Sequence, residues 1–206
     1  MVTVLHVLGA TNAGKTTFLD QMVDIYGDRV RRVEIGKILR AKYLDPDSPH
    51  FEPDKFKGQS NPKETADEAW KLYLDLVNEA TNAEGVEIVL VDGQPRDVEQ
   101  AEAVMNFVGV NDEIRIEFIL VHADHEKRAE RLAQRFDDEH DPGFRLGLAR
   151  MESDYRGLYD VLAVLASHGI VPKVLDTSEA PIGPEGVERV RGVCPTVWSM
   201  FNAEAV

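Results

Sequence analysis

The sequence has little cysteine and little positive charge, and each shortage excludes a class of protein. Cys194 is the single cysteine among 206 residues, so an internal disulfide and a cysteine-ligated zinc site are both excluded. Lysine and arginine together number 23 against 37 aspartate and glutamate residues, which gives a formal net charge of −14. A chain this acidic is a poor partner for DNA, RNA or an anionic membrane. We therefore expect no nucleic-acid or membrane partner, and no feature of the sequence indicates an obligate protein partner.

Long hydrophobic runs are also missing. The N-terminus passes directly into the apolar segment 2–8 without a basic leader, and no stretch approaches the ~20 apolar residues that a membrane-spanning helix needs. We expect neither a signal peptide nor a membrane span, and the default location is the cytoplasm. The length suits one domain, 1–206, that can bury a core without a metal or a disulfide.

Segments of strand length alternate with segments of helical periodicity along the chain. Strands are predicted at 4–8, 30–35, 86–91, 114–121 and 170–175, and helices at 14–26, 37–43, 62–80, 98–108, 126–135, 146–167 and 186–201. This alternation predicts an α/β fold of three layers, in which helices cover both faces of a central parallel sheet. The stretch at about 36–80 is long for a single crossover, so we expect an inserted helical segment there.

The most informative motif follows the first predicted strand. Residues 9–16 read Gly-Ala-Thr-Asn-Ala-Gly-Lys-Thr, which matches the phosphate-loop pattern GxxxxGK[ST]. The glycines let the backbone wrap a phosphate, and the amide groups of the loop and of the next helix direct positive charge toward it. A chance glycine-rich turn is the alternative, but the position between a strand and a helix favours a phosphate loop. The predicted nucleotide-binding residues are Gly9, Asn12, Ala13, Gly14, Lys15, Thr16 and Thr17.

Lys15, Thr16 and Asp92 extend this prediction to Mg²⁺ and a triphosphate. Lys15 can reach the β- and γ-phosphates, and the Thr16 hydroxyl can ligate Mg²⁺. Asp92 follows the predicted strand 86–91, where a carboxylate can hold the same ion directly or through water. An Asp-Gly pair alone is more often a turn, so the assignment of Asp92 depends on the phosphate loop. The expected cofactors are ATP and Mg²⁺.

Asp92 also belongs to a longer motif that resembles a known family. Residues 91–96 read Val-Asp-Gly-Gln-Pro-Arg, and Gln100 follows four residues after Arg96. This resembles the adenylate kinase signature of an apolar residue, Asp, Gly, an aromatic residue, Pro and Arg, followed after three residues by Gln or Asn. Gln94 departs from the signature, because the family usually has Phe, Tyr or Ile there. Residues 34–41 are similar to the family segment Ser-Thr-Gly-Asp-Leu-Leu-Arg-Ala, in which Gly36 and Arg40 match while Ile35 and Lys37 do not.

Other segments extend the resemblance through about residues 3–175. Residues 57–65 match the family's Gly-Gln and Pro-x-Glu-Thr spacing, residues 131–138 resemble the arginine-rich entry to its lid, and residues 150–155 resemble its Arg-Leu-Glu-x-Tyr segment. The phosphate loop departs from the family's Gly-Pro-Gly-Ser-Gly-Lys-Gly-Thr, because Thr16 precedes Thr17. A lid without cysteines excludes zinc.

The resemblance implies a P-loop NTPase fold with a five-stranded sheet, an inserted segment at about 36–80 that binds a nucleoside monophosphate (NMP), and a short lid at about 132–148. It implies that Arg40 and Arg96 bind the acceptor phosphate and that Gln100 reads the base. The implied substrate-binding residues are Gly36, Arg40, Gly93, Arg96 and Gln100. The implied catalytic residues are Lys15, Arg96, Arg131, Arg135 and Arg150.

Helical spacing supports part of this set independently. Arg128, Arg131 and Arg135 are three and four residues apart and share one helix face, although the same spacing suits a solvated face paired with Glu126 and Glu130. The choice between Arg128 and Arg131 stays open.

The predicted function is transfer of the γ-phosphoryl group of ATP to a nucleoside monophosphate, with AMP or dAMP as the expected acceptor. The attacking phosphate oxygen is already anionic, so no general base is required. Two alternatives stay open. One is a kinase of another nucleotide or of a small molecule on the same fold, and the other is a non-enzymatic ATP-binding switch module.

Overall fold

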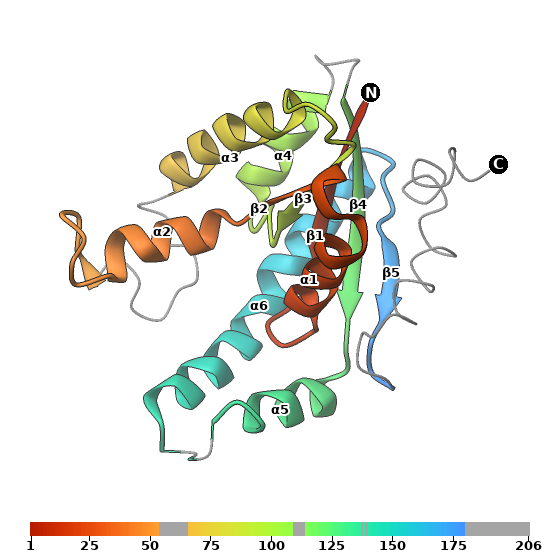
Figure 1. The fold of residues 1–206 in the computed structure, drawn as a ribbon. Coiled ribbons are helices and arrows are strands. Elements are labelled where there is room, and N and C mark those ends of the chain that lie inside the picture. The colour runs from red at the N-terminus through yellow and green to blue at the C-terminus, as the bar shows by residue number, and fades with distance from the viewer. Residues whose placement is uncertain (54–65, 109–113, 137, 139, 180–206) are drawn as a thin grey trace.

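The computed structural model describes residues 1–53, 66–108, 114–136, 138 and 140–179 (Figure 1). Along the chain its elements are β1 (Val2–Leu8), α1 (Lys15–Tyr26), the 3-10 helix η1 (Gly27–Arg29), β2 (Val30–Val33), α2 (Ile35–Leu44), α3 (Ala66–Thr81), β3 (Ile88–Asp92), α4 (Val98–Val108), β4 (Ile114–His122), α5 (His125–Ala133), α6 (Pro142–Ser167) and β5 (Lys173–Asp176). The predicted alternation of strands and helices is confirmed for these residues. The expected helix at 186–201 and the family-like segment 57–65 lie outside the described residues.

The strands form a single parallel sheet. Its order is β2-β3-β1-β4-β5, and each neighbouring pair is parallel. The predicted α/β P-loop fold with a five-stranded central sheet is therefore confirmed. In the register of the sheet, Val7 of β1 lies opposite Asp92 of β3, and Leu8 lies opposite Leu120 of β4. The three central strands thus end at the same edge of the sheet.

Alternate side chains of β1 face two separate layers of helices. Val4 and Leu8 pack in a core with residues of α3, α4 and α6. Leu5 and Val7 pack in a second core with residues of α1. Because both faces of the central strand are covered, its sequence is largely apolar. None of the described helices is long and apolar enough to cross a membrane.

Some element boundaries differ from the sequence prediction. The predicted strand 30–35 ends at Val33, and α2 already begins at Ile35. Helix α6 begins at Pro142 rather than near 146, because the side chain of Asp141 accepts a hydrogen bond from a backbone N–H of the first turn and proline suits that turn. Strand β5 begins at Lys173 rather than 170. The earlier start of α6 shortens the connection from α5, which lies within the predicted lid.

The phosphate-loop segment lies at the edge where the central strands end. Figure 1 shows the connection from β1 to α1 at the same end of the molecule as α5 and the first turns of α6. Open parallel sheets bind their ligands at the carboxyl ends of the strands. This edge is therefore where the functional side chains should meet.

Candidate active site

The connection between β1 and α1 has the backbone that a phosphate cradle requires. Gly9, Asn12 and Gly14 have φ values of 141°, 64° and 99°. A Cβ on Gly9 would lie 2.2 Å from the carbonyl oxygen of Val121 in β4, so only glycine fits against that strand. Helix α1 follows Gly14 with no side-chain cap and no acidic residue in its first turn. Its first N–H groups are therefore available to an anion.

Lys15 folds back onto the loop. Its Nζ donates hydrogen bonds to the carbonyl oxygens of Gly9 at 2.5 Å and Ala10 at 2.9 Å. Burial lowers the pKa of Lys15 from 10.5 to about 8, while the negative charge of Asp92 acts in the opposite direction. A triphosphate would have to replace these two carbonyls as the acceptor for the ammonium group.

Thr16 and Asp92 are the oxygen donors that the sequence interpretation assigns to Mg²⁺. Thr16 is exposed in the first turn of α1, and Asp92 ends β3, with its carboxylate 3.4 Å from Nη2 of Arg32. Among the described residues, no group of three or more His, Cys, Asp or Glu side chains could hold a metal ion. Hydroxyl and carboxylate oxygens are nevertheless donors that Mg²⁺ prefers. The donor set therefore fits an ion that arrives together with phosphate oxygens.

Arginines from three elements meet beside the phosphate loop. Arg40 lies on α2, Arg96 follows β3, and Arg150 lies on α6. A Cβ on Gly36 would lie 3.2 Å from Nη1 of Arg40 and 3.4 Å from Nη2 of Arg96, so both guanidinium groups approach the same glycine. Burial lowers the pKa of Arg96, and repulsion from Arg40 and Arg150 lowers it further. Like charges gathered in this way favour the binding of an anion between them.

Gly93 orients the guanidinium group of Arg96. The Arg96 Nε donates to the carbonyl oxygen of Gly93 at 2.7 Å, and a Cβ on Gly93 would lie 3.2 Å from Nη2 of Arg96. Gly93 has a φ of 63°, in the left-handed region. The structure thus brings together Gly36, Arg40, Gly93 and Arg96, and their role in binding an acceptor phosphate stays a prediction.

Asp154 is a carboxylate in this cluster that the sequence interpretation missed. It lies on α6 and accepts a hydrogen bond from the backbone N–H of Thr11 at 2.6 Å and another from the Thr11 hydroxyl. Burial lowers the pKa of Lys15 and that of Arg96, and the charge of Asp154 opposes the effect in both. Asp154 therefore connects α6 to the phosphate loop. No local pattern could indicate a contact between residues 143 positions apart.

Arg128 supports the phosphate loop from inside the protein. Its side chain is fully buried, and its guanidinium lies 4.4 Å from the ring centroid of Tyr155. Nε donates to the carbonyl oxygen of Thr11 at 2.8 Å, and Nη2 donates to that of Met151 at 3.2 Å. The alternative of a solvated helix face is therefore wrong for Arg128, which ties α5 to the loop and to α6.

Arg131 lies at the rim of the same loop. Its Nη1 donates to the carbonyl oxygen of Asn12 at 3.2 Å and to the hydroxyl of Thr177 at 3.0 Å. Its Nη2 donates to the Thr177 carbonyl oxygen at 2.7 Å. Arg135 follows the end of α5, and its side chain is exposed. Arg128 and Arg131 thus contact consecutive loop carbonyls, whereas a role of Arg135 in catalysis stays a prediction.

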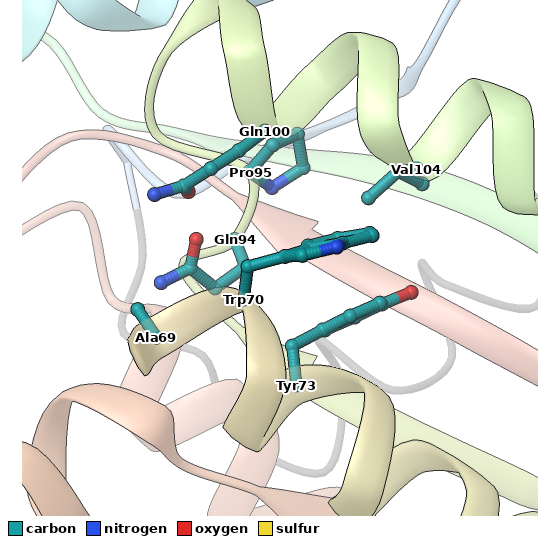
Figure 2. Close-up of a pocket in the computed structure, with 7 residues that line it drawn as sticks. All are labelled: Ala69, Trp70, Tyr73, Gln94, Pro95, Gln100 and Val104. Atoms are coloured by element: carbon teal, nitrogen blue, oxygen red, sulfur yellow. The ribbon is translucent and has the colours of Figure 1, made fainter. Parts of the chain in front are cut away.

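A narrow pocket lies beside Arg96, between α3 and α4 (Figure 2). Its lining residues are Ala69, Trp70, Tyr73, Gln94, Pro95, Gln100 and Val104. The Gln100 Oε1 accepts a hydrogen bond from the backbone N–H of Arg96 at 3.0 Å. The Asp97 carboxylate accepts one from the backbone N–H of Gln100 at 2.8 Å, which caps α4 and fixes its start. The predicted base-reading residue is therefore bonded directly to a predicted phosphate-binding residue.

His6 lies beneath this pocket, and the sequence interpretation did not single it out. Its Nδ1 is 2.9 Å from the carbonyl oxygen of Gln94, and its Nε2 is 3.2 Å from the Tyr73 hydroxyl. A neutral imidazole satisfies both contacts, with Nδ1–H donating and Nε2 accepting. Burial lowers the pKa of His6 from 6.5 to about 4, while its bond to Gln94 acts in the opposite direction. A histidine within a largely apolar strand was the available signal.

Comparisons with known proteins agree with this geometry. Residues 8–142 match a protein-family model described as an AAA domain. The chain belongs to this family. It is also 27% identical over 116 residues to an adenylate kinase of a Nitratiruptor species, a match that covers 55% of this chain and 56% of that protein. It is 24% identical over 116 residues to an adenylate kinase of Helicobacter pylori, covering 55% of this chain and 57% of that one.

The chain thus spans just over half the length of the curated relatives that it matches. These likenesses make it an adenylate kinase-like member of the family. The family match, 8–142, includes the phosphate loop, Arg40, Arg96 and Gln100, but it ends at the first residue of α6. Arg150 and Asp154 therefore lie outside the family match.

Proposed function

We propose that this adenylate kinase-like protein transfers the γ-phosphoryl group of ATP to the phosphate of a nucleoside monophosphate, with AMP or dAMP as the preferred acceptor. The observation that carries the proposal is the meeting of Lys15 with the arginines of three other elements. Arg96 interacts electrostatically with Lys15 and also with Arg40 and Arg150. A protein that only switches on binding a nucleotide needs cationic side chains for one polyphosphate. The cluster of Lys15 and the three arginines has enough positive charge to bind a second phosphate group beside it.

The proposed chemistry depends on position and charge. The acceptor phosphate carries an anionic oxygen at neutral pH, so no side chain has to remove a proton. Lys15 would exchange its loop carbonyls for the β- and γ-phosphate oxygens, and Arg40 and Arg96 would hold the acceptor phosphate. Arg150 would neutralise charge on the transferring group. Alignment and charge stabilisation together would supply the catalysis.

We assign the remaining parts as follows. Thr16 and Asp92 would hold Mg²⁺, which when bound neutralises charge on the phosphates. The acceptor-binding segment is 36–80, to which α2 contributes Arg40 and α3 contributes one wall of the pocket. The lid is 132–148, and it carries Arg135. Its closure would exclude water, which otherwise competes with the acceptor for the phosphoryl group.

A panel of acceptors at fixed Mg-ATP tests the proposal. We expect AMP or dAMP to have a kcat/KM about tenfold or more above that of CMP, UMP or GMP, because a lost base contact typically costs ~1–3 kcal/mol. The Arg31→Ala variant, which removes an exposed arginine on β2, should behave as the wild type. Bound ATP without transfer to any monophosphate would favour the switch module instead.

Asp154 supports a second candidate, a kinase whose acceptor is a hydroxyl group. Such a reaction needs a base near the transferring phosphoryl group, and the Asp154 carboxylate interacts with Lys15, Arg96 and Arg150. The variant Asp154→Asn separates the two candidates. Transfer to a phosphate acceptor should survive this change, whereas transfer to a hydroxyl acceptor should be lost.

A further inference from the structure

Two glutamine side chains face the same pocket. Gln94 is 5% exposed and Gln100 is 6% exposed. Figure 2 shows their carboxamide groups on the same side of the pocket, near Ala69. The family signature that residues 91–96 resemble usually has Phe, Tyr or Ile at the position of Gln94. A second amide in the pocket is therefore a departure from that signature.

The orientation of the Gln100 amide is fixed by the backbone. Its Oε1 accepts from the N–H of Arg96 at 3.0 Å. Its Nε2 is buried and has no hydrogen-bond partner among the described residues. Gln100 therefore presents an N–H donor. A buried donor without a partner is costly, so a ligand that brings an acceptor atom gains from filling this position.

For Gln94, the backbone is held in place and not the side-chain amide. The hydrogen bond from His6 to Gln94 uses the backbone carbonyl oxygen and not the carboxamide. His6 in turn contacts the hydroxyl of Tyr73, so Gln94 is tied at its backbone to both β1 and α3. The carboxamide of Gln94 can then offer an oxygen acceptor next to the fixed donor of Gln100.

Besides the two glutamines, Ala69, Pro95 and Val104 and the aromatic side chains of Trp70 and Tyr73 line the pocket. Trp70 and Tyr73 stack with ring centroids 4.8 Å apart and an interplanar angle of 15°. Figure 2 shows the indole of Trp70 between Tyr73 and Pro95. The two amides beside this stack suit the polar edge of a nucleobase.

We propose that Gln94 is a specificity-determining residue that reads the acceptor base together with Gln100. Gln100 Nε2 donates to a ring nitrogen of the base, and Gln94 Oε1 accepts from the exocyclic amino group next to that nitrogen. An amino-substituted base such as adenine carries both groups side by side. This inference rests on the proposed function, because it takes the pocket to be the acceptor-base site.

The test removes, one at a time, the two groups of the proposed hydrogen bond: the exocyclic amino group of the base and the side-chain amide of Gln94. AMP is compared with purine riboside 5′-monophosphate, which lacks the exocyclic amino group. For the wild type we expect kcat/KM to favour AMP by about tenfold, the size of one lost hydrogen bond to a base. Gln94→Met, which has similar length and no amide, should reduce this ratio to about one. Gln94→Glu keeps an oxygen acceptor and should keep the preference.

The ratio of kcat/KM for AMP to kcat/KM for purine riboside 5′-monophosphate distinguishes a specificity role of Gln94 from a structural role. Damage to folding lowers activity with both substrates and leaves their ratio unchanged. Asn106→Leu, which removes an exposed amide on α4, is the matched control and should keep the wild-type ratio. If Gln94→Met keeps the preference for AMP, the inference is overturned while the proposed function stands.

Failure of the proposed function gives a different result. In that case the wild type phosphorylates neither monophosphate. Calorimetry then gives the dissociation constants of AMP and of purine riboside 5′-monophosphate, and their ratio replaces the ratio of kcat/KM values. Tighter binding of AMP by the wild type, lost in Gln94→Met, still supports the inference. Equal affinity of the wild type for the two compounds, or no binding of either, overturns it.

Discussion

ATP binding to this protein should take up a proton at Lys15 when the pH is above about 8. In the ligand-free loop, burial lowers the pKa of Lys15 from 10.5 to about 8. A bound triphosphate would bring several negative charges to the same nitrogen and favour its protonated form. The empty loop therefore loses its proton at a pH at which the complex keeps it.

The size of the effect follows from the pKa of the empty loop. With a pKa of about 8, about one loop in ten carries a neutral lysine near pH 7, and about nine in ten carry one near pH 9. If ATP binds the ammonium form, its affinity should fall about tenfold between these two pH values. Binding near pH 9 should then take up about 0.9 proton. The phosphates of ATP are fully ionised at that pH, so they do not contribute.

Calorimetry in pairs of buffers with different ionisation enthalpies measures this uptake directly. Titration with Mg-ATP should show the uptake for the wild type and not for Lys15→Met. Lys127→Met removes a lysine that pairs with Glu130 on the surface of α5, and it should match the wild type. The reasoning is refuted if the wild type near pH 9 takes up no more protons than Lys15→Met while ATP still binds.

The same pKa shift affects the stability of the ligand-free protein. Between about pH 8 and pH 10.5 the unfolded chain holds a proton at Lys15 that the folded chain has released. The free energy of unfolding therefore rises with pH across this window. Chemical denaturation of Lys15→Met should show a flatter profile over the same range.

Four further substitutions test other parts of the site. The folded-state pKa of His6 is about 4 against 6.5 in the unfolded chain, so the free energy of unfolding should fall as the pH drops from 6.5 to 4, and denaturation curves of His6→Gln should show a smaller fall. Arg96→Ala should weaken the binding of the acceptor monophosphate far more than that of ATP in calorimetry, and an equal loss of both affinities would contradict its assignment. Arg128→Met should lower the free energy of unfolding by about 3 kcal/mol in denaturation curves, because it removes a buried guanidinium that bonds the loop. Arg131→Met should cost less, because Arg131 is only partly buried.

The sequence alone predicted the features that depend on neighbours along the chain. Apolar spacing predicted the alternation of strands and helices, since burial on one face or both imposes a period on the side chains. The glycines at 9 and 14 predicted the loop, because the backbone there adopts conformations that favour glycine. The segment 91–96 predicted that Arg96 and Gln100 belong to one site, since only a turn of helix separates them. These local rules also located the edge of the sheet at which the site lies.

The tertiary structure decided which side chains meet across that edge. Arg128 and Arg131 carry the same charge and lie on the same face of α5. The packing of α5 against α6 nevertheless buries Arg128 and leaves Arg131 at the rim of the phosphate loop. The contact of Thr11 with Asp154 joins residues 143 positions apart, and that of His6 with Gln94 joins residues 88 positions apart. Contacts of this kind depend on how helices pack on a twisted sheet, and residue spacing along the chain does not encode that packing. The pocket with two amides therefore appears only when β1, α3 and α4 come together.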